Sequence, residues 1–321
     1  MTKPVPVTAG SQALARAELA EQARAYVAAA KAPNTVRAYR SDWTDFTYWC
    51  ESQGVGALPA SPETVAAYLT DLSQVAKPST LARRLSSISQ AHQAAGHETP
   101  TRHATVRAVW AGIRRTKGTA QEGKTPAVLA DVRAMVGALP NSLTGIRDRA
   151  LLLLGFAGAF RRSELVSLDI ADVEEVAEGL VVIIRRSKTD QEAQGRKVGI
   201  PYGSHLETCP VRAVKAWLEA AQLRGGSLFR AVSRHGQVSE ARLSDRAVAL
   251  VVKRRAQAAG LDPDNFAGHS LRAGFATAAA AAGVPERAIM AQTGHKSLPI
   301  LRRYIREGSI FRDNAAAYVG L

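Results

Sequence analysis

A polar stretch without hydrophobic periodicity divides this chain, and it constrains the fold more than any other feature. Residues 116–126 read TKGTAQEGKTP, with two glycines, several charges and no apolar repeat, which is typical of a linker. A chain of 321 residues usually forms two domains. We therefore expect a tail over 1–22, a helical domain over 23–117, a linker over 118–126 and a second domain over 127–321.

The region before the linker is predicted to be all helical. From Thr35 to Gly54, apolar residues recur every three or four positions, as they do on the buried face of a helix. Ser61 is a suitable N-cap for a second helix, and Pro62 suits its first turn. Two more helices are expected over 79–96 and 105–115.

The region after the linker is predicted to be mostly helical with one β-hairpin. The β-branched run 180–185 and the extended run 197–200 flank a polar turn that contains glycine, which indicates two paired strands. The fold class is therefore mainly α with a small β-sheet. Helices are expected over 131–139, 145–159, 211–223, 243–259, 270–282, 285–293 and 298–306.

The charge of the chain points to a polyanionic partner. The formal net charge is +14 and the isoelectric point is about 10.2, and the positive excess is present on both sides of the linker. Such a surface attracts nucleic acid, although a solvated basic surface without a ligand has the same composition. Charge alone therefore gives a direction and not a function.

Several classes of protein are disfavoured by what the sequence lacks. Cys50 and Cys209 stand far apart, so neither a disulfide framework nor a cysteine-based zinc site is expected. Residues 1–10 lack the apolar core of a signal peptide, and the apolar run 151–160 is too short to span a bilayer. We found no Walker-type loop, no zinc-ligand cluster and no carboxylate pair for magnesium. We expect a cytoplasmic protein without membrane association, metal or small-molecule cofactor.

Four short patterns follow one another in the C-terminal region. Taken singly, each has an ordinary explanation: a surface ion pair, a solvated hairpin lysine, a capping histidine or a packed tyrosine. Their order and spacing together are far more specific. The patterns are FRRSEL at 160–165, SKT at 187–189, HSLR at 269–272, and GH at 294–295 followed by RY at 303–304.

In order and spacing these patterns resemble the catalytic set of the tyrosine recombinase family, also called the phage integrase family. The resemblance covers residues 127–310, and the module at 34–115 is less specifically similar to the core-binding domain of that family. It implies a SAM-like helical core-binding domain, a mostly helical catalytic domain and a C-shaped clamp around duplex DNA. The catalytic residues that it implies are Arg161, Lys188, His269, Arg272, His295 and Tyr304.

The chemistry of phosphodiester cleavage fits these residue types. Arg161 and Arg272 carry permanent, bidentate positive charges that stabilise the extra negative charge on a phosphate under attack. The phenol of Tyr304 is a weak nucleophile at neutral pH unless a base such as His269 accepts its proton. In the family the leaving group is a deoxyribose 5′-oxygen, and Lys188 is the expected donor of its proton.

One residue outside this set and one residue within it are expected to have supporting roles. Glu164 lies one helical turn after Arg161 and is expected to fix an arginine in place, although a solvated glutamate is an equal alternative. His295 is expected to donate a hydrogen bond to a phosphate oxygen. The chain departs from the common family pattern at Arg162, where an apolar residue is usual, and at Leu301, where a threonine is frequent.

The DNA contacts expected in the N-terminal region come from two helices. Arg83 and Arg84 are candidates for a groove contact, and Arg37 and Arg40 are candidates for phosphate contacts. The resemblance implies double-stranded DNA as the partner and a homotetramer on two recombining sites. An apolar set in the 17 residues after Tyr304 is expected to dock on a neighbouring protomer.

The resemblance implies a site-specific recombinase that cuts and rejoins DNA through a covalent 3′-phosphotyrosyl intermediate. One alternative is a type IB topoisomerase-like enzyme, which has a similar site but relaxes DNA without assembling two sites; the apolar tail speaks against it. The other is a DNA-binding accessory protein with a decayed site. Every expected catalytic position is filled, which disfavours decay.

Overall fold

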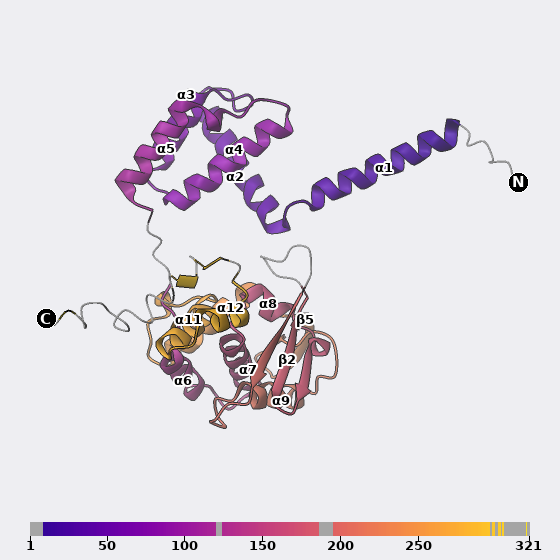
Figure 1. The fold of residues 1–321 in the computed structure, drawn as a ribbon, viewed down its shortest axis with the longest axis vertical. Helices are drawn as coiled ribbons and strands as arrows, with labels where there is room; N and C mark the ends of the chain where they lie inside the picture. Colours follow the sequence, from indigo (N-terminus) through magenta and orange to yellow (C-terminus); the bar gives the residue numbers. More distant parts are fainter. Residues whose placement is uncertain are drawn as a thin grey trace, which may run out of the picture. The chain divides into compact units, whose positions relative to one another are not determined.

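The protein has two compact units, residues 1–122 and 123–321, and the division falls inside the segment predicted as a linker. The computed structural model describes residues 9–119, 124–185, 195–295, 297–298, 301–302, 304 and 319 (Figure 1). Each unit has its own hydrophobic core.

The first unit is helical throughout its described part. Its elements are α1 (Ala9–Ala29), α2 (Pro33–Ser52), α3 (Pro62–Leu72), α4 (Pro78–Ala94), a 3-10 turn (Pro100–Arg102) and α5 (Ala104–Lys117). The Ser61 hydroxyl accepts a hydrogen bond from the backbone N–H of Thr64, so it caps α3 as its position indicates. The segment expected to be a tail is helical from Ala9 onward. The core of this unit contains Phe46, Tyr68, Leu69, Leu81 and Ile88, all fully buried.

The second unit is mostly helical and holds the expected hairpin. Its helices are α6 (Leu129–Gly137), α7 (Leu143–Ala157), α8 (Arg162–Ser167), α9 (Pro210–Ala220), α10 (Asp245–Ala258), α11 (Ser270–Ala281) and α12 (Glu286–Thr293), with 3-10 turns at Ile170–Asp172 and Pro263–Asn265. Its strands are β1 (Val173–Val176), β2 (Gly179–Ile184), β3 (Arg196–Pro201), β4 (Arg230–Val232) and β5 (Val238–Arg242).

Two antiparallel sheets form in this unit, in the orders β1-β2-β3 and β4-β5. Leu180 pairs with Ile200 and Val182 pairs with Val198, so their side chains share one face and enter the core. The pairing of β2 with β3 matches the predicted hairpin. Strands β1, β4 and β5 were not predicted.

Helix α7 is the centre of the second core. Leu151, Leu152 and Leu154 on it are completely buried, and it packs against α9, where the indole of Trp217 donates to the carbonyl of Leu228 at 2.8 Å. A helix that is apolar on several faces is expected to be enclosed on those faces. Such enclosure fixes the end of α7, from which the first catalytic pattern follows.

The chain that enters the second unit is bound to the segment around α11. The backbone N–H of Thr125 donates to the carbonyl of Asn265 at 2.8 Å, and that of Ala127 donates to the carbonyl of Ser270 at 2.9 Å. Gly274 faces Ala127 so closely that an added Cβ would lie 1.8 Å from the Ala127 oxygen. A glycine is therefore required at this crossing.

Candidate active site

Arg272 is the most deeply buried cation of the site. Its side chain is only 1% exposed, and Nη1 donates to the carbonyl of Ala159 at 2.8 Å and to that of Thr293. Its Nε and Nη2 have no hydrogen-bond partner among the described residues. Burial, and then the charge of Arg161, lower the pKa of Arg272 to about 9, which leaves it protonated at neutral pH. Buried N–H donors without partners indicate that an anion belongs there.

The backbone at Ala159 is shaped to serve Arg272. Ala159 follows α7, is completely buried and has a φ of 48°, a left-handed conformation that costs a non-glycine residue about 1–3 kcal/mol. This turn exposes its carbonyl to the guanidinium and directs the chain toward Arg161. The strain is therefore located where the site needs an acceptor.

Arg161 is held by a buried carboxylate at the start of α8. Glu164 is 1% exposed; its Oε1 accepts from Arg161 Nη1 at 2.5 Å, and its Oε2 accepts from the Arg161 backbone N–H at 2.9 Å. Arg162, which could be confused with Arg161 in the sequence, is 42% exposed and stands 3.9 Å from Asp245. The geometry therefore places Arg161, and not Arg162, against Glu164.

Tyr304 lies beside two histidines. Its hydroxyl is 3.2 Å from Nε2 of His269, the residue that precedes α11. The ring centroids of His269 and His295 lie 6.4 Å and 6.1 Å from that of the tyrosine. Behind it, Leu301, at the position that departs from the family pattern, is fully buried among alanines of α11 and Ile289 of α12. The nucleophile and its expected base are thus within hydrogen-bond reach.

His295 is held by Thr293 at the end of α12. The Thr293 hydroxyl donates to the carbonyl of Ile289 at 2.7 Å, so its oxygen accepts from Nδ1 of His295 at 2.8 Å. Burial, and then the positive charges of Arg272 and Arg161, lower the pKa of His295 to about 3. A neutral His295 in this tautomer presents a lone pair at Nε2. Donation from that atom to a phosphate requires a second proton, which the negative charge of the phosphate favours.

The structure brings together six of the residues selected from the sequence: Arg161, Glu164, His269, Arg272, His295 and Tyr304. Lys188 lies outside the described residues. The sequence reasoning missed Arg196, whose Nη1 donates to the carbonyl of Gln292 at 2.9 Å and whose Nη2 is 3.5 Å from Glu164. A signal was available, because Arg196 shares a strand face with the buried Val198 and Ile200.

The candidate DNA contacts of the first unit differ in their pairing. Arg37 and Arg40 are exposed on α2. Arg83 is 49% exposed and makes two hydrogen bonds to the buried carboxylate of Asp42, at 2.7 Å and 2.9 Å. Arg84 is 12% exposed and pairs with Asp42 and Asp45. Two of the four candidate cations are therefore already matched by carboxylates.

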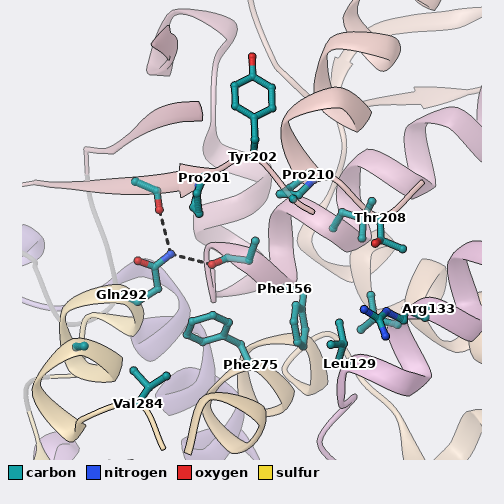
Figure 2. Close-up of a pocket in the computed structure, with 16 residues that line it drawn as sticks. Leu129, Arg133, Phe156, Pro201, Tyr202, Thr208, Pro210, Phe275, Val284 and Gln292 are labelled. Atoms are coloured by element: carbon teal, nitrogen blue, oxygen red, sulfur yellow. Dashed lines mark hydrogen bonds between the residues drawn. The ribbon is translucent and has the colours of Figure 1, made fainter. Parts of the chain in front are cut away.

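A pocket of about 470 Å³ lies in the second unit, away from the tyrosine. Figure 2 shows Phe156 and Phe275 next to each other among the lining residues, with Gln292 bonded to the carbonyls of Ala157 and Gly199. Most of its wall is apolar, including Leu129, Val132, Leu153, Pro201 and Val284. An open apolar pocket of this kind suits an apolar segment of a polypeptide.

The described residues contain neither a cluster of metal ligands nor a membrane-spanning helix. Within the described ranges no group of three or more His, Cys, Asp or Glu side chains is placed to hold a metal ion. In the same part of the chain, no helix has the length and apolar character needed to cross a bilayer.

Family models match both units. The model described as the phage integrase family matches residues 129–309, and the model described as the phage integrase N-terminal SAM-like domain matches residues 24–99. The first match alone covers more than half of the chain and contains every residue of the candidate site.

Curated relatives and solved structures agree with these models. An integrase/recombinase xerD homolog of Selenomonas ruminantium is 46% identical over 289 residues, covering 89% of this chain and 85% of that protein. A tyrosine recombinase XerC of Myxococcus xanthus is 29% identical, covering 89% and 92%. A lambda integrase dimer bound to a COC′ core site matches with a TM-score of 0.60 at 19% identity over 91% of this chain and 95% of that one. A lambda integrase tetramer bound to a Holliday junction matches with a TM-score of 0.58 at 18% identity, covering 87% and 73%.

Proposed function

The chain belongs to the phage integrase family and is a tyrosine-type site-specific recombinase, and from this premise we propose that Tyr304 is its nucleophile. The Tyr304 oxygen forms a bond to a DNA phosphorus atom while the bond from phosphorus to the 5′-oxygen breaks. The products are a 3′-phosphotyrosyl link and a free 5′-hydroxyl. In the reverse step, a free 5′-hydroxyl from another DNA strand attacks the phosphotyrosyl phosphorus and releases Tyr304. The two strands are thereby exchanged.

The contact between His269 and Tyr304 carries this proposal. A tyrosine hydroxyl lies 3.2 Å from an imidazole nitrogen, next to a buried guanidinium whose Nε and Nη2 have no partner in the described part of the chain. This arrangement combines a nucleophile, a base and an anion site. His269 accepts the phenolic proton as the Tyr304 oxygen approaches phosphorus. The neighbouring cations favour the phenolate during that step.

The two arginines are proposed to stabilise the transition state. The negative charge on the non-bridging oxygens increases as the tyrosine attacks, and preorganised donors stabilise it without having to move. Nε and Nη2 of Arg272 supply such donors from a fixed position. Arg161 adds a second fork, oriented by Glu164.

Protonation of the leaving group is proposed for Lys188. The 5′-alkoxide is too basic to leave readily without a proton, and a lysine ammonium is a suitable donor. His295 is proposed to support the phosphate after taking up a second proton. With these roles every proton in the cleavage step has a donor and an acceptor.

The test is a covalent-adduct assay with Tyr304→Phe. The variant is expected to bind DNA nearly as well as the unmodified chain, because affinity is distributed over many phosphate contacts. It is expected to form no protein–DNA adduct that survives denaturation, since its side chain has no nucleophilic oxygen. A surviving adduct in this variant would assign the nucleophile to another residue.

Double-stranded DNA is the proposed partner, with Arg37, Arg40, Arg83 and Arg84 as contacts in the first unit. We also propose a cytoplasmic homotetramer on two sites, in which the apolar residues after Tyr304 dock on the next protomer. The pocket of Figure 2 on the neighbouring protomer is a suitable receptor for this tail, because most of its lining residues are apolar. Docking from each protomer to the next closes into a ring.

Truncation after Arg306 tests this assembly. The shortened chain keeps every proposed catalytic residue, so it is expected to form the covalent adduct weakly while losing strand exchange between two sites. Val284→Asp, which places a charge in the wall of the pocket, is expected to have the same effect. Normal strand exchange by both variants would exclude the tail and pocket as the assembly contact.

A further inference from the structure

We infer that Arg196 is a positioning residue for Arg161 and for the end of α12, an inference that rests on the proposed function. Arg196 is the first residue of β3, and its guanidinium bridges Glu164 on α8 and the carbonyl of Gln292 on α12. Both elements lead to residues of the site: α8 begins beside Arg161, and α12 leads into His295.

The bridge to α8 acts through a shared carboxylate oxygen. Oε2 of Glu164 accepts from the backbone N–H of Arg161 at 2.9 Å and lies 3.5 Å from Nη2 of Arg196. Glu164 is 1% exposed, so a single buried carboxylate serves two arginines. The second cation holds the carboxylate in place, and the carboxylate then orients the Arg161 guanidinium.

The bridge to α12 depends on a glycine. Gly294 has a φ of 66°, and a Cβ at this position would lie 2.8 Å from Nε of Arg196. The guanidinium therefore packs directly on the backbone between Thr293 and His295. Thr293 is the residue that holds both Arg272, through its carbonyl, and His295, through its hydroxyl.

The contacts of Arg196 favour a positioning role over a surface phosphate contact, because both terminal nitrogens are directed at oxygens of the protein. Its side chain is 22% exposed, and its Nε is fully enclosed with no partner among the described residues. Burial lowers its pKa, while Glu164 opposes that effect. A cation kept at this cost, and directed at a carboxylate and a carbonyl rather than at solvent, serves geometry more than DNA affinity.

Arg185 supplies a matched control. It flanks the same hairpin loop from the β2 side and is also ion-paired, with Asp172 at 2.7 Å, but its partners lie outside the site. Removing either arginine changes the charge near the loop equally. Only the removal of Arg196 releases Glu164 and α12.

The experiment measures single-turnover cleavage of DNA carrying a site mapped from covalent adducts. Arg196→Ala is expected to cleave on the order of 10- to 100-fold more slowly, the effect of a displaced catalytic group, with DNA affinity changed by less than about threefold. Arg196→Lys keeps the charge without the fork, so it is expected to recover part of the rate. Arg185→Ala is expected to stay within about threefold of the unmodified chain.

A second substrate separates positioning from folding. Replacing one non-bridging oxygen with a methyl group removes the charge that Arg161 stabilises, so the defect of Arg161→Ala is expected to shrink on this methylphosphonate DNA. The defect of Arg196→Ala is expected to shrink in the same way. An equal defect on both substrates, tracking a lower melting temperature, would overturn the inference, as would a normal rate for Arg196→Ala. Failure of the proposed function shows separately, as an adduct in Tyr304→Phe or a normal rate for Arg161→Ala.

Discussion

Arg83 and Arg84 of the first unit and Arg272 of the second unit are held in opposite ways. In the first unit Arg83 and Arg84 are matched by Asp42 and Asp45, so the four charges cancel. In the second unit Arg272 is held by two backbone carbonyls, which orient the guanidinium without cancelling its charge. A carboxylate partner orients an arginine side chain but neutralises its positive charge. A backbone carbonyl orients the side chain and leaves its full positive charge to act on a ligand.

The largest expected effect on the cleavage rate comes from removing Arg272, which the two carbonyls hold. Arg272→Ala is expected to slow cleavage by about 10³-fold, because a preorganised donor to the transition state is lost.

Replacing the 5′-bridging oxygen with sulfur gives a leaving group of pKa about 8.5 that needs no proton, so this substrate is expected to rescue Lys188→Ala but not Arg272→Ala. Cleavage rates of both variants on oxygen and sulfur substrates provide the measurement.

Two outcomes would count against these assignments. A Lys188→Ala variant that binds DNA normally yet is not rescued by sulfur would end the general-acid role of the lysine. A milder defect in Arg272→Ala than in Arg162→Ala would show that the exposed arginine, and not the buried one, meets the phosphate.

Much of this arrangement could be predicted from the sequence. The helices of both units follow from apolar residues spaced three or four apart, and the hairpin follows from two β-branched runs around a polar turn. Strands β1 and β5 escaped prediction because Glu174, Glu175 and Glu240 interrupt short strands that face solvent. Helix α8 has only six residues, too few to show periodicity.

The site could be predicted only where side chains act. The roles of Arg161 and Tyr304 were implied by the family resemblance, and that of Glu164 by its place one helical turn after Arg161. The structure places these residues together. The carbonyls of Ala159 and Thr293 could not be identified in this way, since every residue has a carbonyl and its direction depends on the folded backbone. Arg196 needed the strand alternation to be extended one residue into the polar turn.

A smaller effect is expected from breaking the carboxylate-held pair. Asp42→Asn is expected to destabilise the first unit by about 1–3 kcal/mol, because Arg83 and Arg84 lose the charged acceptor that they share. Asp71→Asn makes the same charge change on α3, where the carboxylate accepts from the Trp49 indole. Thermal unfolding measures stability, and titrations at two salt concentrations measure DNA affinity.

The control determines how the result is interpreted. An increase in non-specific DNA affinity shared by both variants reflects net charge, whereas a loss of stability confined to Asp42→Asn reflects the arginine pair. Equal stability of the two variants would mean that the carboxylate-held pair is no more than a surface ion pair.

An effect that depends on pH is expected from His295. In the folded chain its pKa is about 3, while an unfolded histidine titrates near 6.5, so the unfolded state binds the proton first as the pH falls. Stability is therefore lost between pH 6.5 and 3, and His295→Asn is expected to weaken that dependence. Denaturant unfolding of the unmodified chain and of His295→Asn at several pH values measures this dependence. If the free energy of unfolding changes with pH equally in both, the pKa of His295 is not lowered by folding.

The attachment of the linker to α11 has a mechanical consequence. At the end of the linker, backbone hydrogen bonds join Thr125 to Asn265 and Ala127 to Ser270, on either side of His269. Gly274, two residues beyond Arg272, locks the same crossing. Tension along the linker therefore acts first on the segment that carries His269 and Arg272, and only then on the hydrophobic core. The same few hydrogen bonds resist that tension and keep the reacting groups aligned.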